Sequence, residues 1–520
     1  MSALVTDQFR ILNASNFVDS VGDTSNNAYY ITVGLPNPTI VGYGRSNTWN
    51  TNPPAPIDNL AYNKHTGDVT LYGRRVSSSN VRRLARKIEW TSGSKYEMYR
   101  HDYSVLNPSP LTNASRLYDA NYYVINSDYR VYICIENGSS GDNPKGNNSQ
   151  DEPRFTDLEP SRAGDSGDGY IWKYLFTISP SDIIKFDSIE YITVPNDWAT
   201  STDSQIRAVR ESADSSINEN QIKTVYIQDQ GANYANGLGQ EVDIIGDGTG
   251  GKVRVDVVGG KITNTVVTSG GKDYSYAMVD LGSINSNTTG TSAHLIPIIP
   301  PSKGHGYDIY NELGTDKVLV YARFDDSDKD FPTDTSSAQV SIVKNPTQVG
   351  TSDIYKANNF NGLNAFKFQT VTGTPKVGEK IFQRVQQNTA RAFGYVASYD
   401  QDTKVLKYFS DRSLFLNQTT LDTQDYTGIS TNGRRYNFES SSELITGTTS
   451  SFTGSIDTTF SGFTVNPTGT KLINLGVNFT GGTAVSEINK GSGDIIYLDN
   501  RASIARNARQ KEDLKIILEF

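Results

Sequence analysis

A glycine-bounded serine at residues 164–167 (Gly-Asp-Ser-Gly) is the pattern closest to a catalytic one in this 520-residue chain. Nucleophilic catalysis by Ser166 would need a histidine base, a buried carboxylate and an oxyanion hole. His65 and His101 precede the serine, but Asp168 stands where such a nucleophile loop has glycine. The pattern therefore predicts a tight turn, and Ser166→Ala is expected to have only a small local effect.

Two further patterns are typical of ligand loops, and each departs from the form that its ligand requires. Residues 246–251 (GDGTGG) fit the glycine pattern of dinucleotide-binding loops, which must open a helix. Residues 252–258 alternate as a strand does, so a β-turn is predicted instead. The acidic loop at 325–330 contains the start of a calcium loop (DSDKD), but Phe331 and Ser337 stand where an EF-hand has glycine and glutamate. The sequence leaves open whether this loop holds a metal.

The few histidines and the one cysteine lack the spacing of metal ligands. His65, His101, His294 and His305 lie far apart, and none pairs with Cys134 as zinc ligands do. One cysteine cannot form an intrachain disulfide, which fits folding in a reducing cytosol. We predict no catalytic residue, no metal ligand, no cofactor and no small-molecule substrate, so the chain is not expected to be an enzyme.

Arginine is concentrated at positions 74, 75, 82, 83 and 86, followed by Lys87. This basic cluster could contact an acidic partner subunit, remain solvated or meet nucleic acid. No aromatic stacking platform is interleaved with it, and contact with a partner subunit is the preferred interpretation.

A second candidate contact begins at Trp49, which precedes the rigid, extended residues 52–56 (NPPAP). This segment could be a docking arm or a strap over the protein's own core. The predicted partner-contact residues are Trp49, Pro53, Pro54, Arg82, Arg83 and Arg86.

Composition excludes several classes of function. The formal net charge of −9 makes general nucleic-acid binding unfavourable, because that affinity comes from neutralising phosphates. The first residues lack the basic and apolar regions of a signal peptide, and no run of about 18 apolar residues predicts a membrane span. Thirty tyrosines and 45 glycines are typical of β-structure with frequent turns.

Short periodic segments predict the elements that position these residues. Residues 14–21 are expected to form a helix, and Asn80 is expected to cap another, with an apolar face over 81–88. Strands are predicted at residues 29–33, 122–125, 129–135, 170–176, 318–324, 339–343 and 515–520. The Ser/Thr/Gly tract at 446–462 is expected to be a loop or linker.

The predicted fold is mainly β with minor α, as a multidomain chain with a mixed α+β core and inserted all-β sandwich or barrel domains. The glycine-rich insertion contains two Gly-x-x-Tyr endings, at 231–234 and 271–274. The predicted segments are an N-terminal core at 1–215, the β insertion at 216–300, a return to the core at 301–350, a barrel or sandwich at 351–480 and C-terminal strands completing the core at 481–520.

An ordered series of short motifs resembles the dimeric baseplate wedge subunit of T-even-like contractile-tailed phages. The motifs lie at residues 16–22, 29–33, 47–49, 53–58, 87–90, 167–176, 191–195, 340–346 and 494–501, with Phe520. The resemblance covers residues 1–200, 300–346 and 485–520. It leaves 220–300 and 355–480 as inserted or remodelled domains.

The resemblance implies a structural protein of a myovirus virion, located in the tail baseplate and assembled in the host cytoplasm. Its expected partners are a second copy of itself, as a homodimer, and other baseplate wedge proteins. It would bridge inner wedge proteins to peripheral, fibre-bearing ones and move as a rigid unit during tail contraction. No nucleic acid and no membrane insertion are expected.

Two rival functions stay open. A tail-associated glycan- or receptor-binding protein is favoured by the tyrosines and the Gly-x-x-Tyr endings, and such a protein is expected to be trimeric. A hydrolase on a β-scaffold would need paired carboxylates or the Ser166 machinery.

Overall fold

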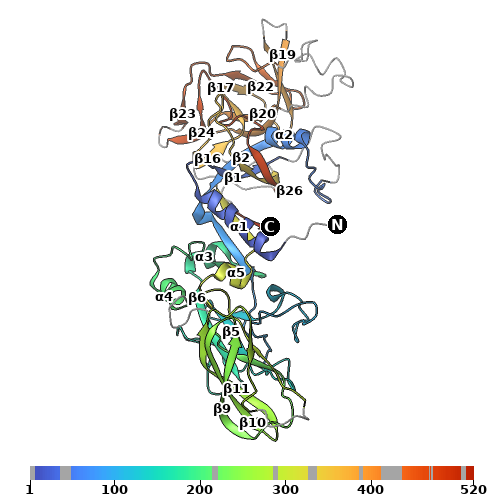
Figure 1. The fold of residues 1–520 in the computed structure, drawn as a ribbon. Helices are drawn as coiled ribbons and strands as arrows, with labels where there is room; N and C mark the ends of the chain where they lie inside the picture. Colours follow the sequence, from blue (N-terminus) through green and yellow to red (C-terminus); the bar gives the residue numbers. More distant parts are fainter. Residues whose placement is uncertain are drawn as a thin grey trace. The chain divides into compact units, whose positions relative to one another are not determined.

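The computed structural model of this chain describes residues 6–35, 49–213, 221–284, 291–325, 337–385, 390–410, 436–467, 469, 472–504 and 511–520. Strands dominate throughout, as Figure 1 shows, in several sheets and one closed barrel. The predicted fold class, mainly β with minor α and several domains, is confirmed.

The contacts between residues divide the chain into two units. Unit 1 contains residues 1–18, 82–319 and 517–520, and unit 2 contains residues 19–81 and 320–516. The chain changes unit within four elements, namely α1 (Asp7–Gly22), β3 (Val81–Arg86), β14 (Lys317–Phe324) and β27 (Glu512–Glu519). Three of these belong to a sheet of order β27-β14-β3-β7, in which β7 is Tyr191–Val194. The finer division into five segments stays a prediction.

Unit 1 contains most of the helices and the glycine-rich strands. Its other elements are η2 (Leu117–Asp119), β4 (Tyr123–Ile125), β5 (Arg130–Asn137), β6 (Tyr170–Thr177), α3 (Pro180–Phe186), α4 (Ser204–Ala213), β8 (Val225–Asp229), β9 (Gly237–Gly246), β10 (Thr249–Val258), β11 (Lys261–Lys272), β12 (Ala277–Val279), β13 (His294–Pro297) and α5 (Ile309–Leu313).

The antiparallel sheet β4-β5-β6 contains the aromatic core of unit 1. Tyr170 and Trp172 of β6 are fully buried, and their rings stack with centroids 5.3 Å apart. Asn126 closes the β4–β5 turn, because its Oδ1 accepts the backbone N–H groups of Asp128 and Arg130. The predicted hairpin and aromatic strand are confirmed.

The two Gly-x-x-Tyr endings share one local structure. Gly231 and Gly271 have φ values of 65° and 62°, and the residue two positions later has a positive φ in both copies. Tyr234 and Tyr274 are buried, and a Cβ on either glycine would lie 2.6 or 2.7 Å from a ring carbon of its own tyrosine. Glycine is needed for the left-handed backbone and for the space beneath the ring. The repeated tyrosines therefore belong to the core of the insertion.

Unit 2 combines an open sheet with a barrel. Its elements are β1 (Tyr29–Gly34), α2 (Leu60–Val69), β2 (Thr70–Val76), η1 (Ser78–Asn80), β15 (Ser337–Lys344), β16 (Asn359–Asn361), β17 (Asn364–Thr372), β18 (Lys380–Val385), β19 (Ala390–Asp400), β20 (Val405–Phe409), β21 (Ile445–Gly447), β22 (Thr453–Ile456), β23 (Gly462–Val465), β24 (Ile473–Phe479), β25 (Thr483–Ala484) and β26 (Asp494–Ile504). The open sheet has the order β16-β2-β1-β15-β26, and the central β1 is buried along its whole length.

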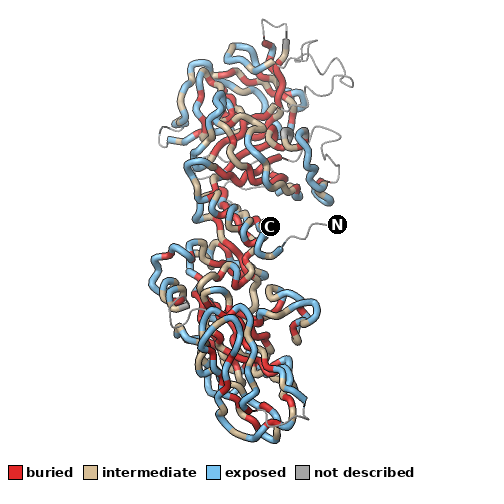
Figure 2. Tube along the Cα trace, viewed as in Figure 1, coloured by how far each residue is buried: buried red, intermediate tan, exposed pale blue. Residues whose placement is uncertain are grey.

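The barrel closes because β20 pairs with both β19 and β17. Its ring of strands is β20-β19-β18-β21-β22-β17, and β25 is added beside β17. Figure 1 shows β17, β19, β20 and β22 together in one unit, and Figure 2 shows many buried residues in that region. Phe366, Phe368, Leu406 and Phe452 are among the fully buried side chains inside it.

Two predicted elements are wrong. Residues 81–88 were expected to form a helix, but 81–86 form strand β3, and Asn80 ends the short helix η1 instead. Residues 83, 84 and 85 of β3 are consecutive and all buried, so both faces of the strand are covered. The helical spacing of the apolar residues therefore did not indicate a helix with one buried face. The polar tract at 446–462 contributes β21 and β22 to the barrel, where partner strands supply its hydrogen bonds.

Candidate partner-contact surfaces

Trp49 is fixed against strand β26 within unit 2. Its side chain is 6% exposed, and its indole Nε1–H donates to the backbone carbonyl of Arg501 over 2.7 Å. The side chain of the next residue, Asn50, accepts the backbone N–H of Ser503. These bonds hold the beginning of the proline-containing segment on the unit's own sheet.

The segment after Trp49 is held at two more points. The carbonyl of Pro54 accepts a hydrogen bond from Asn500 Nδ2 at 2.9 Å, and Pro53 and Pro54 are both half-buried. At its far end, Asn59 caps α2, because its Oδ1 accepts the backbone N–H of Tyr62 at 2.8 Å. The segment is held on its own unit as a strap would be, and residues 55–60 are exposed as those of a docking arm would be.

The proline arm, residues 53–60, presents apolar surface to solvent. Ile57 is 48% exposed and Leu60 is 74% exposed. Because this segment is already fixed in place, it loses little conformational freedom when a partner covers its apolar surface, and burial of that surface favours binding. The sequence pattern does not indicate either residue as a contact, because single apolar residues in a polar stretch show no periodicity.

Arg82 is paired inside unit 1. Its Nε and Nη2 atoms contact the two carboxylate oxygens of Asp182 at 3.0 and 2.9 Å, and its guanidinium lies 5.1 Å from the ring centroid of Phe186. Both partners belong to α3, so the charge of Arg82 attaches that helix to β3.

Arg83 and Arg86 also contact unit 1 itself. Arg83 is 3% exposed, lies 3.8 Å above the ring centroid of Tyr310 and donates to Ser15 Oγ. Arg86 Nη2 donates to the carbonyl of Ala120 at 2.8 Å. The structure does not gather the three predicted arginines into one exposed patch, and their contact with a partner stays a prediction.

Two buried carboxylates organise the loops of unit 1. Glu97, 2% exposed, accepts the backbone N–H of Thr112 at 2.9 Å and that of Asn121 at 2.5 Å, one on each oxygen. Glu312, 1% exposed, faces His305 Nδ1 at 2.6 Å with one oxygen and accepts the Gly306 N–H at 2.7 Å with the other. Both carboxylates therefore satisfy buried donors of the same unit.

Burial raises the pKa of two groups on β5. Desolvation raises the pKa of the Glu136 carboxyl above its usual 4.5, against the opposing effects of Thr224 and Arg162. Burial also raises the pKa of the Cys134 thiol well above its ordinary value, which keeps this sulfur in the unreactive thiol form.

Ser166 and His101, two residues of the serine-nucleophile pattern, form hydrogen bonds within unit 1. Ser166 is exposed, its backbone N–H donates to Asp151 Oδ2 at 2.9 Å, and its side-chain hydrogen bond lowers the pKa of that carboxyl. His101 Nδ1 accepts a hydrogen bond from the backbone N–H of Ile299, and burial lowers the pKa of the His101 imidazole.

The predicted β-turn at 246–251 is confirmed as the β9–β10 connection. Its Asp247 has a pKa of about 2, because the carboxylate accepts hydrogen bonds from Ser275 and Tyr276. Residues 326–330 of the acidic loop lie outside the described residues. Among the residues that the structure describes, no group of three or more histidine, cysteine or acidic side chains is placed to hold a metal ion.

Within the described part of the chain, none of the helices has the length and hydrophobicity needed to cross a bilayer.

Comparison with known proteins relates part of unit 1 to a phage protein family. The family model described as "Bacteriophage T4, Gp8" matches residues 124–235, about a fifth of the chain. Gp8 is a baseplate wedge protein, and the matched region runs from the β4–β5 hairpin through β6 and α4 to β8. No curated protein matches the chain. The match supports relationship to a T4-like baseplate wedge family, and with it a structural role in the virion tail.

Proposed function

We propose that this chain is a structural subunit of the baseplate wedge of a contractile phage tail. The observation that carries the proposal is the family match over residues 124–235, a region that contains the buried aromatic sheet of unit 1. In this role the chain acts without catalysis, and the carboxylates and histidines described above stabilise its loops.

Its proposed partners are a second copy of the chain and other wedge proteins. As a homodimer, it bridges inner wedge proteins to peripheral, fibre-bearing proteins and moves as a rigid unit when the tail contracts. It assembles in the host cytoplasm and remains in the tail baseplate. The proline arm is one proposed contact, because its exposed Ile57 and Leu60 belong to a segment held by Trp49 and Asn59.

The test is the mass of the purified full-length chain, alone and mixed with wedge proteins from the same genome, by size-exclusion chromatography with light scattering. A dimer that joins a larger stable complex is the expected result. A trimer, or a monomer that ignores these proteins, would contradict the wedge role and favour a receptor-binding tail protein.

Leu60→Asp tests the contact by the proline arm. Aspartate in the first turn of α2 favours the helix, so the change removes apolar surface without weakening the fold. We expect at least tenfold weaker binding to one wedge partner. Leu238→Asp is the matched control, because Leu238 is 77% exposed and lies in unit 1. Equal binding by both variants would exclude the arm as a contact.

A further inference from the structure

A large cavity of unit 2 lies at one end of the barrel. It has a volume of about 810 Å³. It is bordered by Asn364 at the start of β17, by Tyr408 near the end of β20, which is opposite Asn364 in the strand register, and by β25. Barrel mouths are common ligand sites, and this volume falls within the roughly 300–1,000 Å³ of small-molecule pockets.

A rigid aromatic group forms one wall of the cavity. Tyr408 stacks on Phe366 with ring centroids 4.4 Å apart and an interplanar angle of 12°, and Phe438 packs edge-on against Tyr408 at 4.9 Å. Tyr408 and Phe438 line the cavity, together with Tyr436. An aromatic wall that is fixed before binding offers contact area to an apolar ligand face at low entropic cost.

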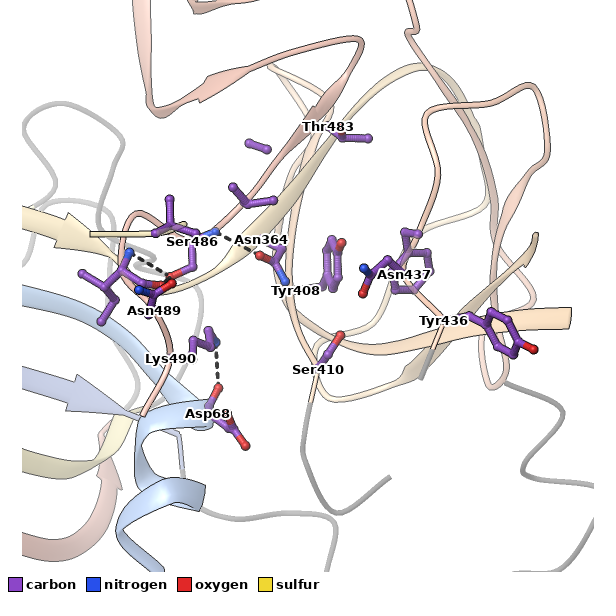
Figure 3. A pocket seen from close by; sticks show the side chains of 15 residues that line it. Asp68, Asn364, Tyr408, Ser410, Tyr436, Asn437, Thr483, Ser486, Asn489 and Lys490 are labelled. Atoms are coloured by element: carbon purple, nitrogen blue, oxygen red, sulfur yellow. Dashed lines mark hydrogen bonds between the residues drawn. The ribbon is translucent and has the colours of Figure 1, made fainter. Parts of the chain in front are cut away.

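Two amide side chains in this wall have hydrogen-bonding capacity to spare. Asn364 Oδ1 accepts the backbone N–H of Ser486 at 3.0 Å, which fixes the orientation of the amide. Among the described residues, no partner binds Asn364 Nδ2 or the amide of Asn437. Figure 3 shows Asn364 and Asn437 on either side of Tyr408. The oriented amide of Asn364 and the exposed amide of Asn437, beside an aromatic ring, match a ligand that carries many hydroxyl groups.

The formal charges in the lining balance. The lining contains one acidic residue, Asp68, and one basic residue, Lys490, and Lys490 Nζ donates to the carbonyl of Asp68 at 2.7 Å. An anionic ligand would find no surplus of positive charge there. Val349 and Val485, 38% and 63% exposed, add apolar surface to the same lining.

We propose that this cavity binds a neutral oligosaccharide of about two or three sugar rings, a size that suits its volume. The C–H faces of the sugars pack on the exposed part of Phe438 and on the valines, and the hydroxyl groups bond to Asn364 and Asn437. The site does not depend on the proposed wedge function, because none of its residues lies in the matched region.

The test is saturation-transfer difference NMR on the full-length protein with maltotriose, triacetylchitotriose and, as a charged probe, 3′-sialyllactose. Asn364→Asp keeps the acceptor for Ser486 N–H and removes the free donor, and Asn437→Ala removes the second amide. Asn466→Ala is the matched control, because Asn466 is exposed in the same unit and does not line the cavity.

We expect a neutral probe to bind the native protein, and at least one cavity variant to bind it at least tenfold more weakly, with the control unchanged. The proposal is overturned if neither neutral probe binds at millimolar concentration, if only the charged probe binds, or if both cavity variants bind as the native protein does. Wedge assembly is measured separately, so failure here leaves the oligomer experiment unaffected.

Discussion

Glu97→Gln is expected to destabilise unit 1 although it changes almost no volume. The two carboxylate oxygens of Glu97 each accept a different backbone N–H, from Thr112 and from Asn121. An amide has only one oxygen, so one of these fixed donors must face the new NH₂ group. Leaving a buried donor unsatisfied costs about 1–3 kcal/mol, and here the backbone N–H and the new NH₂ group both lack an acceptor. Removing a buried charge offsets part of this cost. The expected net loss is about 2 kcal/mol.

Glu312→Gln is the matched control, because it is buried in the same unit and also accepts a backbone N–H, from Gly306. Its other oxygen faces His305 Nδ1, which can accept a hydrogen bond from the amide when the ring proton is on Nε2. This change is therefore expected to cost less than about 1 kcal/mol.

Urea unfolding followed by tryptophan fluorescence measures the difference. Trp90, Trp172 and Trp198 lie in unit 1 and Trp49 in unit 2, so the signal reports mainly on unit 1. A loss of about 2 kcal/mol lowers the midpoint by roughly 1 M at an m-value of about 2 kcal/mol per M. If Glu97→Gln shifts the midpoint no further than Glu312→Gln does, the argument from fixed backbone donors is wrong.

Two other changes test the unit at separate places. Burial raises the folded-state pKa of Glu136 above its unfolded value. The contribution of this carboxyl to the free energy of unfolding is therefore fully present below pH 4.5 and is lost as pH rises through the folded pKa. Glu136→Gln should thus match the native melting temperature near about pH 4 and exceed it near about pH 8, and equal differences at both pH values would contradict this sign. Gly271→Ala should lower the melting temperature more than Gly239→Ala does. Both glycines have a positive φ, worth about 1–2 kcal/mol against alanine, but only a Cβ at 271 meets backbone atoms, at 2.6 Å. Similar shifts for the two alanine variants would show that close packing at 271 is relieved.

Local signals in the sequence were sufficient where neighbours in the chain determine the structure. The hairpin at β4 and β5 follows from two β-rich runs around Asn126, which makes the turn with its own side chain. The helix expected at 81–88 failed because β3 is held from outside. Its Arg83 packs on Tyr310, which is distant in the chain, so no nearby residue signals the burial of that charge.

The candidate contacts show the same limit. The sequence located the proline segment but not its anchors, because Trp49 and Pro54 are fixed by Arg501 and Asn500 from the distant strand β26. The cavity at the barrel mouth was missed for a related reason. Asn364, Tyr408 and Asn437 come from separate segments, and only closure of the barrel brings them together.

The abundance of tyrosine has a structural explanation that weakens its use as a sign of glycan binding. The hydroxyls of Tyr123 and Tyr132 donate to the carbonyls of Arg86 and Phe155, at 2.8 and 2.6 Å, while their rings are buried. A tyrosine thus fills the core and also satisfies a carbonyl of a segment packed against it, which phenylalanine cannot do. A protein with long connections needs many such bonds. The chemistry for a ligand must therefore be sought where polar groups have spare capacity, as at Asn364, and a count of aromatic residues does not locate it.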